Sequence, residues 1–166
     1  MRTVYMSFEI DESVDSVYEL LSDFNNYQKY AEAVNRVEIT NQSRDFCESR
    51  WEVRFRDGLL RWNENDRFYP GDHRIEFYQT QGDLEVFEGW WQVVSMADSQ
   101  SQLDFVATLD LGLPQLEAML EPIAEEALGE NITSIVQGLF PDAKPAIPAV
   151  AKKISRKETE SARGQV

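Results

Sequence analysis

The 166-residue sequence contains few of the residues that build disulfides, metal centres and catalytic triads. It has one cysteine, Cys47, and one histidine, His73. A single cysteine excludes an intramolecular disulfide and a multi-cysteine zinc site. His73 follows Pro70 and Gly71 in an expected turn, which is a poor position for a Ser-His-Asp triad or a histidine metal site. We therefore expect no metal and no cofactor.

Long apolar runs are also missing. No stretch of the sequence approaches the ~20 consecutive apolar residues of a membrane-spanning helix. The N-terminal segment MRTVYMSFEI alternates between apolar and polar residues, unlike the apolar block of a signal peptide. These features predict a chain without a membrane span, for which a cytoplasmic location is the default expectation.

Basic residues are absent from one long part of the sequence. The formal net charge is −14, and residues 75–140 hold twelve acidic residues and no lysine or arginine. An acidic surface repels phosphate groups, so nucleic acid is not an expected partner. The simplest interpretation of these acids is a solvated surface.

The end of the chain has the opposite charge. Residues 141–166 hold six basic and three acidic residues, together with Pro141, Pro145 and Pro148. This composition predicts a flexible basic tail after a folded domain of residues 1–140. We expect deletion of 145–166 to cost little stability, unless the basic tail docks on the acidic segment.

The N-terminal part predicts a strand followed by two helices. Val4, Met6, Phe8 and Ile10 alternate with polar residues, as in a half-buried strand. Ser13 can cap a helix in which apolar residues recur at helical spacing. Those residues are Val14, Val17, Tyr18, Leu21 and Phe24. A second short helix is expected over residues 27–33.

Alternating strands are expected from about residue 34 to residue 111. Asp57-Gly58 and Gly82-Asp83 indicate hairpin turns between them. Strands joined in this way form an antiparallel meander that is apolar on one face. In one strand that face carries both aromatic and acidic residues. The residues on this face are Leu60, Trp62, Glu64, Asp66 and Phe68.

A helix is predicted over residues 123–139, after a short helix that is interrupted at Pro122. Its apolar stripe consists of Ile123, Ala127, Leu128, Ile132, Ile135, Val136 and Leu139. A sheet with one apolar face must bury that face, and this helix is the only element long enough to cover it. The fold class is therefore α+β, with a curved antiparallel sheet around a long C-terminal helix and a space for an apolar ligand between them.

Four segments together resemble the START-like, helix-grip superfamily, and within it the polyketide aromatase/cyclases. The segments are ESVDSVYELLSDFNNY, LLRWNEND, GDLEVFEGWWQV and GENITSIVQGL, and the resemblance covers about residues 3–140. It implies an internal pocket for a polyketide. By the same resemblance the pocket-lining residues are Tyr27, Trp62, Leu84, Phe87, Trp91 and Asn131.

The sequence departs from the aromatase/cyclases at three pocket positions. Asp66 stands where members with a proposed catalytic arginine carry that residue, and Val34 replaces a pocket tyrosine. Ala31 replaces a bulky aromatic residue. The usual arginine–tyrosine pair is therefore absent, unless a shift of the strand register by one residue brings Arg67 inward.

The sequence offers two carboxylates in place of that pair. Glu64 and Asp66 lie on the strand face that also carries Trp62. Burial beside aromatic rings raises the pKa of a carboxyl group toward the range useful for a general base. Asn131 or the Tyr27 hydroxyl could then bind the developing enolate oxygen. Alternatively, the strand bends near Glu64 and both acids lie exposed at the rim of the sheet.

Three functions are compatible with these features. The leading hypothesis is a polyketide cyclase or aromatase that promotes aldol cyclisation and water loss, with its substrate carried by an acyl carrier protein. An acidic carrier protein would dock on basic residues, which are Arg54, Arg56, Arg61 and Arg67 or those of the tail. A non-catalytic carrier or chaperone of a quinone or lipid is the second, by resemblance to START-like coenzyme-Q-binding proteins. A protein-interaction module is the third.

Overall fold

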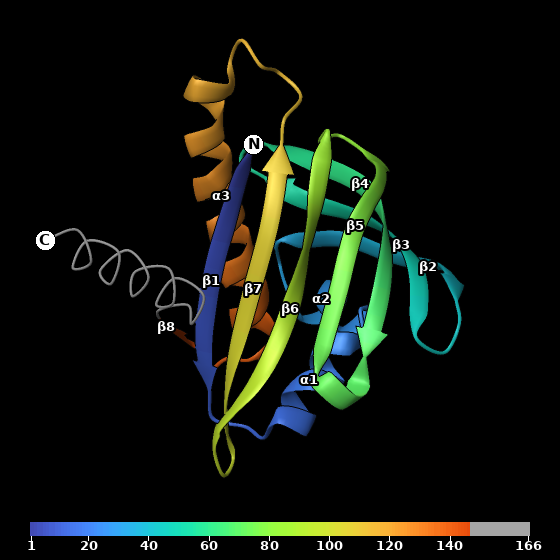
Figure 1. Ribbon diagram of the computed structural model, residues 1–166, viewed down its shortest axis with the longest axis vertical. Coiled ribbons are helices and arrows are strands. Elements are labelled where there is room, and N and C mark those ends of the chain that lie inside the picture. Colours follow the sequence, from blue (N-terminus) through green and yellow to red (C-terminus); the bar gives the residue numbers. More distant parts are fainter. Residues whose placement is uncertain (147–166) are drawn as a thin grey trace, which may run out of the picture.

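Eight antiparallel strands form one curved sheet in the computed structural model, which describes residues 1–146. The strand order is β2-β3-β4-β5-β6-β7-β1-β8, so β2 to β7 form a meander and the N-terminal strand β1 pairs with its last strand, β7 (Figure 1). The strands are β1 Arg2–Ile10, β2 Val34–Gln42, β3 Phe46–Phe55, β4 Gly58–Tyr69, β5 Arg74–Gly82, β6 Val86–Ala97, β7 Gln100–Asp110 and β8 Lys144–Ala146. The predicted curved antiparallel sheet is confirmed.

Two short helices connect β1 to β2. The first, α1, spans Val14–Ser22, and the Ser13 hydroxyl accepts a hydrogen bond from the Ser16 backbone N–H at 3.3 Å. This contact satisfies one of the backbone N–H groups that the start of a helix leaves without a partner. The prediction that Ser13 caps this helix is therefore confirmed. The second helix, α2, spans Asn25–Tyr30 and therefore begins and ends earlier than predicted.

One uninterrupted helix, α3, spans Glu117–Leu139 and lies across the concave face of the sheet (Figure 1). The predicted break at Pro122 is wrong. A proline inside a helix removes one hydrogen bond, here the bond to the Ala118 carbonyl, and disfavours the helix by about 3 kcal/mol. Because Pro122 stands in the second turn, the packed remainder of α3 holds the helix together across it.

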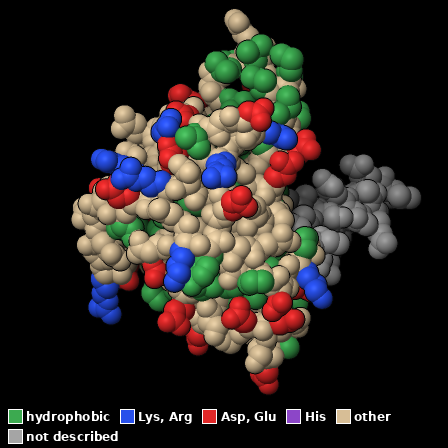
Figure 2. All heavy atoms as spheres, turned by 180° about the vertical axis from the view of Figure 1, so that it is seen from behind, with side chains coloured by type: hydrophobic (Ala, Val, Ile, Leu, Met, Phe, Trp, Pro, Cys, Tyr) green, Lys and Arg blue, Asp and Glu red, His purple; other side chains and the backbone are tan. Residues whose placement is uncertain are grey.

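The buried stripe of α3 begins later than predicted. Ile123 is 49% exposed, whereas Ala124, Ala127 and Ile135 are buried against the sheet. Leu113, Leu116 and Met119 before it are also exposed. Figure 2 shows the resulting group of hydrophobic side chains at the end of the molecule where β7 leads into α3. The first two turns of α3 therefore present apolar groups to solvent.

Sheet curvature depends on a close approach between β6 and β7. A Cβ atom on Gly89 would lie 1.9 Å from the Val106 carbonyl oxygen and 2.8 Å from the Ala107 Cα. Both are backbone atoms that cannot rotate away. Only glycine at this position lets β6 and β7 lie so close.

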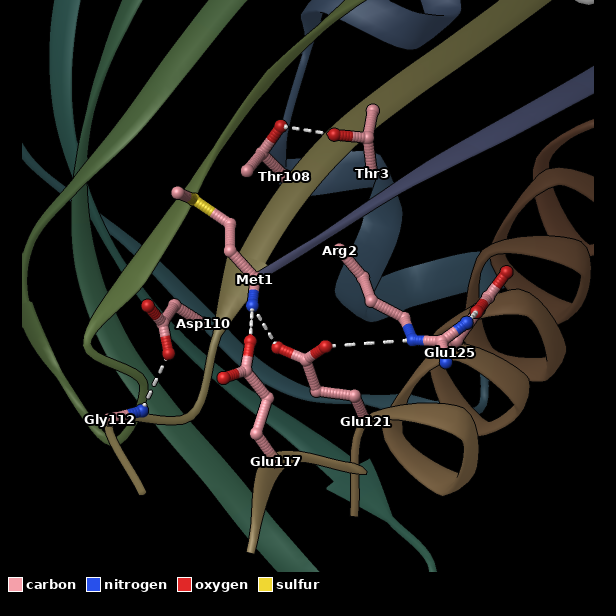
Figure 3. A network of polar contacts seen from close by, with 9 residues as sticks. All are labelled: Met1, Arg2, Thr3, Thr108, Asp110, Gly112, Glu117, Glu121 and Glu125. Carbon is pink, nitrogen blue, oxygen red and sulfur yellow. Dashed lines mark hydrogen bonds and ion pairs between the residues drawn. The ribbon is translucent and has the colours of Figure 1, made fainter. Parts of the chain in front are cut away.

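Polar contacts tie the start of β1 to the first half of α3. Figure 3 shows the Met1 amino group facing Glu117 and Glu121 on α3, and Arg2 facing Glu121 and Glu125. The Arg2 Nη1 to Glu125 Oε2 distance is 2.7 Å. These contacts hold α3 beside β1 while leaving its other side over the concave face.

The short strand β8 lies beyond the predicted domain boundary at residue 140. Its residues pair antiparallel with Ser7–Glu9 of β1, and Ala143 just before it is buried. Lys144–Ala146 are thus part of the sheet and not of a flexible tail. The rest of the predicted tail, residues 147–166, lies outside the described residues. Within residues 1–146, no helix is long and apolar enough to cross a membrane.

Candidate functional site

A cavity of about 70 Å³ lies between the concave face of the sheet and α3. Strands β3 to β7, helix α2 and the middle of α3 contribute to its wall. All eight candidate residues of the sequence lie on this wall. They are Tyr27, Trp62, Glu64, Asp66, Leu84, Phe87, Trp91 and Asn131.

Aromatic rings form most of the cavity wall. Pairing of β3 with β4 places Trp51 opposite Trp62, and their rings stack in parallel with centroids 5.9 Å apart and planes 5° apart. Phe87 packs edge-on against Trp62 at 5.4 Å. A Cβ on Gly82 would lie 2.5 Å from the Trp62 Cβ, so this glycine provides the space in which Trp62 lies beside β5. The wall on the β3–β4 side is therefore made of closely packed rings.

The two candidate carboxyl groups are buried. Glu64 is 6% exposed and Asp66 is 1% exposed, so the alternative of two acids at an exposed rim is wrong. Glu64 pairs with Ser49 and Asp66 pairs with Cys47 on β3, without a bulge between β3 and β4. The alternation of β4 therefore continues unbroken, and both side chains keep the inward direction of Trp62. Arg67 points outward and is exposed.

Each carboxyl group has a different set of hydrogen-bond donors. Trp62 Nε1 donates to Glu64 Oε1 at 2.7 Å. The Ser49 hydroxyl donates to Asp66 Oδ2 at 2.6 Å, and the Cys47 thiol donates to the same oxygen at 3.4 Å. The indole of Trp51 in turn donates to the Ser49 oxygen at 2.8 Å, which orients the hydroxyl toward Asp66.

The pKa values of both carboxyl groups are raised. Burial is the main cause that raises the pKa of Glu64 well above its usual value, and repulsion from Asp66 is the next largest. Burial also raises the pKa of Asp66, but hydrogen bonds from Glu64, Ser49 and Cys47 act in the opposite direction. Two adjacent carboxylates away from water repel each other, and the donors on Asp66 favour its ionised form over that of Glu64.

Tyr27 and Asn131 are already engaged in hydrogen bonds. The Tyr27 hydroxyl donates to the Leu21 carbonyl at 2.7 Å, so it has no second proton for a ligand oxygen. Burial raises the pKa of this hydroxyl well above its usual value, which keeps it neutral. Asn131 Nδ2 donates to the Arg54 carbonyl at 2.8 Å and links α3 to the end of β3. The second hydrogen of the Asn131 amide does not take part in this hydrogen bond.

Sequence reasoning missed Ser49 and Cys47. Both are buried on β3 and both contact Asp66. The signal was available, because Cys47 and Ser49 continue the alternation of Trp51 and Val53 toward the start of the strand. Burial raises the pKa of the Cys47 thiol, which leaves it a protonated donor and not a nucleophile. Within residues 1–146, no three His, Cys, Asp or Glu side chains are grouped to hold a metal ion.

A family model described as polyketide cyclase / dehydrase and lipid transport matches residues 10–136 of the chain. No curated protein matches the sequence significantly. The fold resembles the crystal structure of TTHA0849 from Thermus thermophilus, with a TM-score of 0.78 and 22% identity over 83% of this chain and 94% of that one.

Two further solved structures share the fold. The Zhui aromatase/cyclase from Streptomyces sp. R1128 matches with a TM-score of 0.75 and 15% identity, over 83% of this chain and 90% of that one. A START superfamily protein from Mycobacterium smegmatis matches with a TM-score of 0.72 and 19% identity, over 84% of this chain and 97% of that one. These similarities confirm the predicted START-like, helix-grip fold.

Proposed function

Because the chain belongs to the polyketide cyclase / dehydrase and lipid transport family, we propose that it binds a poly-β-ketone and promotes intramolecular aldol cyclisation and dehydration. One observation carries this proposal. Two carboxyl groups, those of Glu64 and Asp66, are buried side by side in an aromatic cavity, and burial raises the pKa of both. Such a pair provides an acid and a base at the same time and at neutral pH.

Asp66 is the proposed base of the first step. Its carboxylate removes a proton from the methylene group between two carbonyls of the substrate and so forms an enolate. The Ser49 and Cys47 hydrogen bonds keep the negative charge on Asp66, while burial makes that charge a stronger base than in water. A positioned base of this kind typically contributes about 10²–10⁴-fold in rate.

Glu64 is the proposed acid of the second step. The enolate carbon attacks a distant ketone carbon, a C–C bond forms, and the new alkoxide takes the proton of Glu64. In dehydration, the Glu64 carboxylate removes the remaining α-proton and the hydroxyl group leaves as water with the proton that Asp66 acquired. The pair then returns to its starting state, with the proton on Glu64.

The aromatic wall would supply the shape that selects the ring to be closed. Tyr27, Trp62 and Phe87 are stacked or edge-packed against neighbouring rings, so they offer fixed flat surfaces to a folded chain. Leu84 and Trp91 would extend that surface along the cavity. Holding two distant carbons in reacting geometry removes much of the entropic barrier to cyclisation. The second amide hydrogen of Asn131 could bind a ligand carbonyl near the end of β3.

The cavity must widen before it can take such a substrate. Its volume of about 70 Å³ is well below the roughly 300–1,000 Å³ of small-molecule sites. The start of α3 is the proposed moving element, because Met119 and Ile123 are exposed. Its movement would have to break the contacts of Met1 and Arg2 with the glutamates of this helix. The ion pairs that Arg56 forms with Glu126 and Glu130, at 3.7 and 3.6 Å, are exposed and would cost little to break.

An acyl carrier protein remains the proposed source of the substrate. Arg54 and Arg56 at the end of β3 are exposed beside the residues that line the cavity at Phe55 and Leu60. Arg61 is exposed on the next strand. These three arginines would face an acidic carrier protein that delivers a tethered chain at this edge of the cavity.

A product assay with a reactive poly-β-ketone tests the proposal. Glu64→Gln and Asp66→Asn should each lose turnover by about 10²-fold or more, because an amide keeps the shape but cannot exchange the proton. Trp91→Ala should misdirect cyclisation, because it removes part of the wall. Asp104→Asn is the matched control, since Asp104 is equally buried but bonds to Ser7 and Gln102 on the other face.

Two results would contradict the proposal in different ways. Normal turnover by both carboxyl variants, with altered products from Trp91→Ala, would leave a cyclase that works by shape alone. Product ratios equal to those of spontaneous cyclisation for every variant and for the wild type would favour the carrier of a quinone or lipid.

A further inference from the structure

Hydrogen-bond capacity is left over at the acid pair. Asp66 Oδ2 receives the Ser49 and Cys47 hydrogen bonds, and Glu64 Oε1 receives that of Trp62. Among the described residues, no hydrogen-bond donor reaches Asp66 Oδ1, although that atom is fully buried. A buried carboxylate oxygen with so few donors is costly, and it favours a ligand that supplies one.

The rest of the cavity provides no compensating charge. The residues that line it within the described part of the chain include no lysine, arginine or histidine. The pair therefore presents one donor, the Glu64 O–H, and one acceptor, Asp66 Oδ1. A hydroxyl group fits this combination, because it accepts one hydrogen bond and donates another. An ether only accepts, and an ammonium group only donates.

We infer that the cavity selects ligands with a phenolic or enolic hydroxyl group and binds this hydroxyl between Glu64 and Asp66. The ligand hydroxyl accepts a hydrogen bond from the protonated Glu64 carboxyl and donates one to Asp66 Oδ1. The apolar body of the ligand then lies along Trp62 and Phe87. This inference rests on the proposed function, since it assumes that the cavity takes an apolar ligand.

Four one-ring compounds of similar size test the inference. Phenol both donates and accepts, anisole accepts, toluene does neither and benzylammonium only donates. Dissociation constants come from titrations followed by the indole N–H signals of Trp51, Trp62 and Trp91 in NMR spectra. All three indoles surround the cavity. Phenol should bind about tenfold more tightly than toluene, which corresponds to about 1.4 kcal/mol, and anisole should bind like toluene.

Two variants assign the preference to the acid pair. Asp66→Leu keeps a similar shape but removes the acceptor, so the preference for phenol should disappear while toluene binds at least as well. Asp104→Asn should keep the wild-type preference. If Asp66→Leu does not fold, the comparison of phenol with anisole in the wild type still decides, because anisole cannot donate to Asp66.

Failure of the inference differs from failure of the proposed function. Equal binding of phenol and toluene, tighter binding of benzylammonium than of phenol, or an unchanged preference in Asp66→Leu would overturn hydroxyl selection and leave apolar ligand binding intact. Binding of none of the four compounds would overturn both.

Discussion

The raised pKa of Glu64 makes the stability of the protein depend on pH in a defined direction. The pKa of Glu64 is raised in the folded state, so between its unfolded value of about 4.3 and its folded value the folded protein binds more protons. Its stabilising effect is therefore fully present below that unfolded value and is lost as pH rises toward the folded value. A difference of one bound proton changes the free energy of unfolding by about 1.4 kcal/mol per pH unit.

Glu64→Gln removes this proton and should therefore stabilise the protein progressively as pH rises. The amide oxygen can still accept from Trp62, and the amide N–H can donate to Asp66, so packing and hydrogen bonds are kept. Relative to the wild type, the variant should gain about 1.4 kcal/mol per pH unit from pH 5 upward, until Glu64 of the wild type has ionised. In a chain of this length the gain corresponds to about 3–6 °C in Tm per pH unit.

Urea unfolding at pH 5, 6, 7 and 8 measures this difference. Glu48→Gln is the matched control, because Glu48 is exposed on β3 and the chemical change is the same. The control and wild-type curves should run parallel. A constant difference between Glu64→Gln and the wild type over this range would show that Glu64 takes up no extra proton on folding, and the acid–base assignment would then be wrong.

Two further predictions concern the sheet. Gly89→Ala should lose about 3 kcal/mol or more of stability, because its Cβ would meet the Val106 carbonyl; Gly71→Ala, whose Cβ meets nothing within 4 Å, should cost little, and equal Tm values for the two would contradict the argument. Deletion of 147–166 should change Tm by less than about 5 °C, whereas deletion of 141–166 should lower it further by removing Ala143 and the pairing of β8 with β1. A large drop in Tm already on deletion of 147–166 would show that the basic tail docks.

The direction of the site residues was predictable from local periodicity. Successive side chains of a strand alternate between faces, so Trp62, Glu64 and Asp66 had to share one face of β4 whatever the partners of the strand. The family resemblance added Tyr27 and Asn131, and the structure places both on the same cavity. Local pattern and resemblance together therefore sufficed for the α+β fold and for the membership of the wall.

Burial and hydrogen bonding of the acids were decided by tertiary structure. Whether a carboxyl group is exposed depends on what covers it, and the residues that contact Asp66 from another element are Cys47 and Ser49 on β3. Ser49 reaches Asp66 because β3 and β4 pair without a bulge, a register that distant residues set together. The proposed division into acid and base rests on those donors, so it could not be read from β4 alone.

Two element boundaries were likewise set by long-range packing. Pro122 lowers the local helix propensity, but the burial of Ala124, Ala127 and Ile135 against the sheet keeps α3 continuous through it. The three residues of β8 have no strand pattern of their own and become a strand only because the edge of β1 offers free backbone groups. The sequence alone thus determined the class of fold and the inward face of each strand, since both follow from local periodicity. Tertiary structure decided which polar groups lose their water and where elements end, because both depend on segments far apart in the chain.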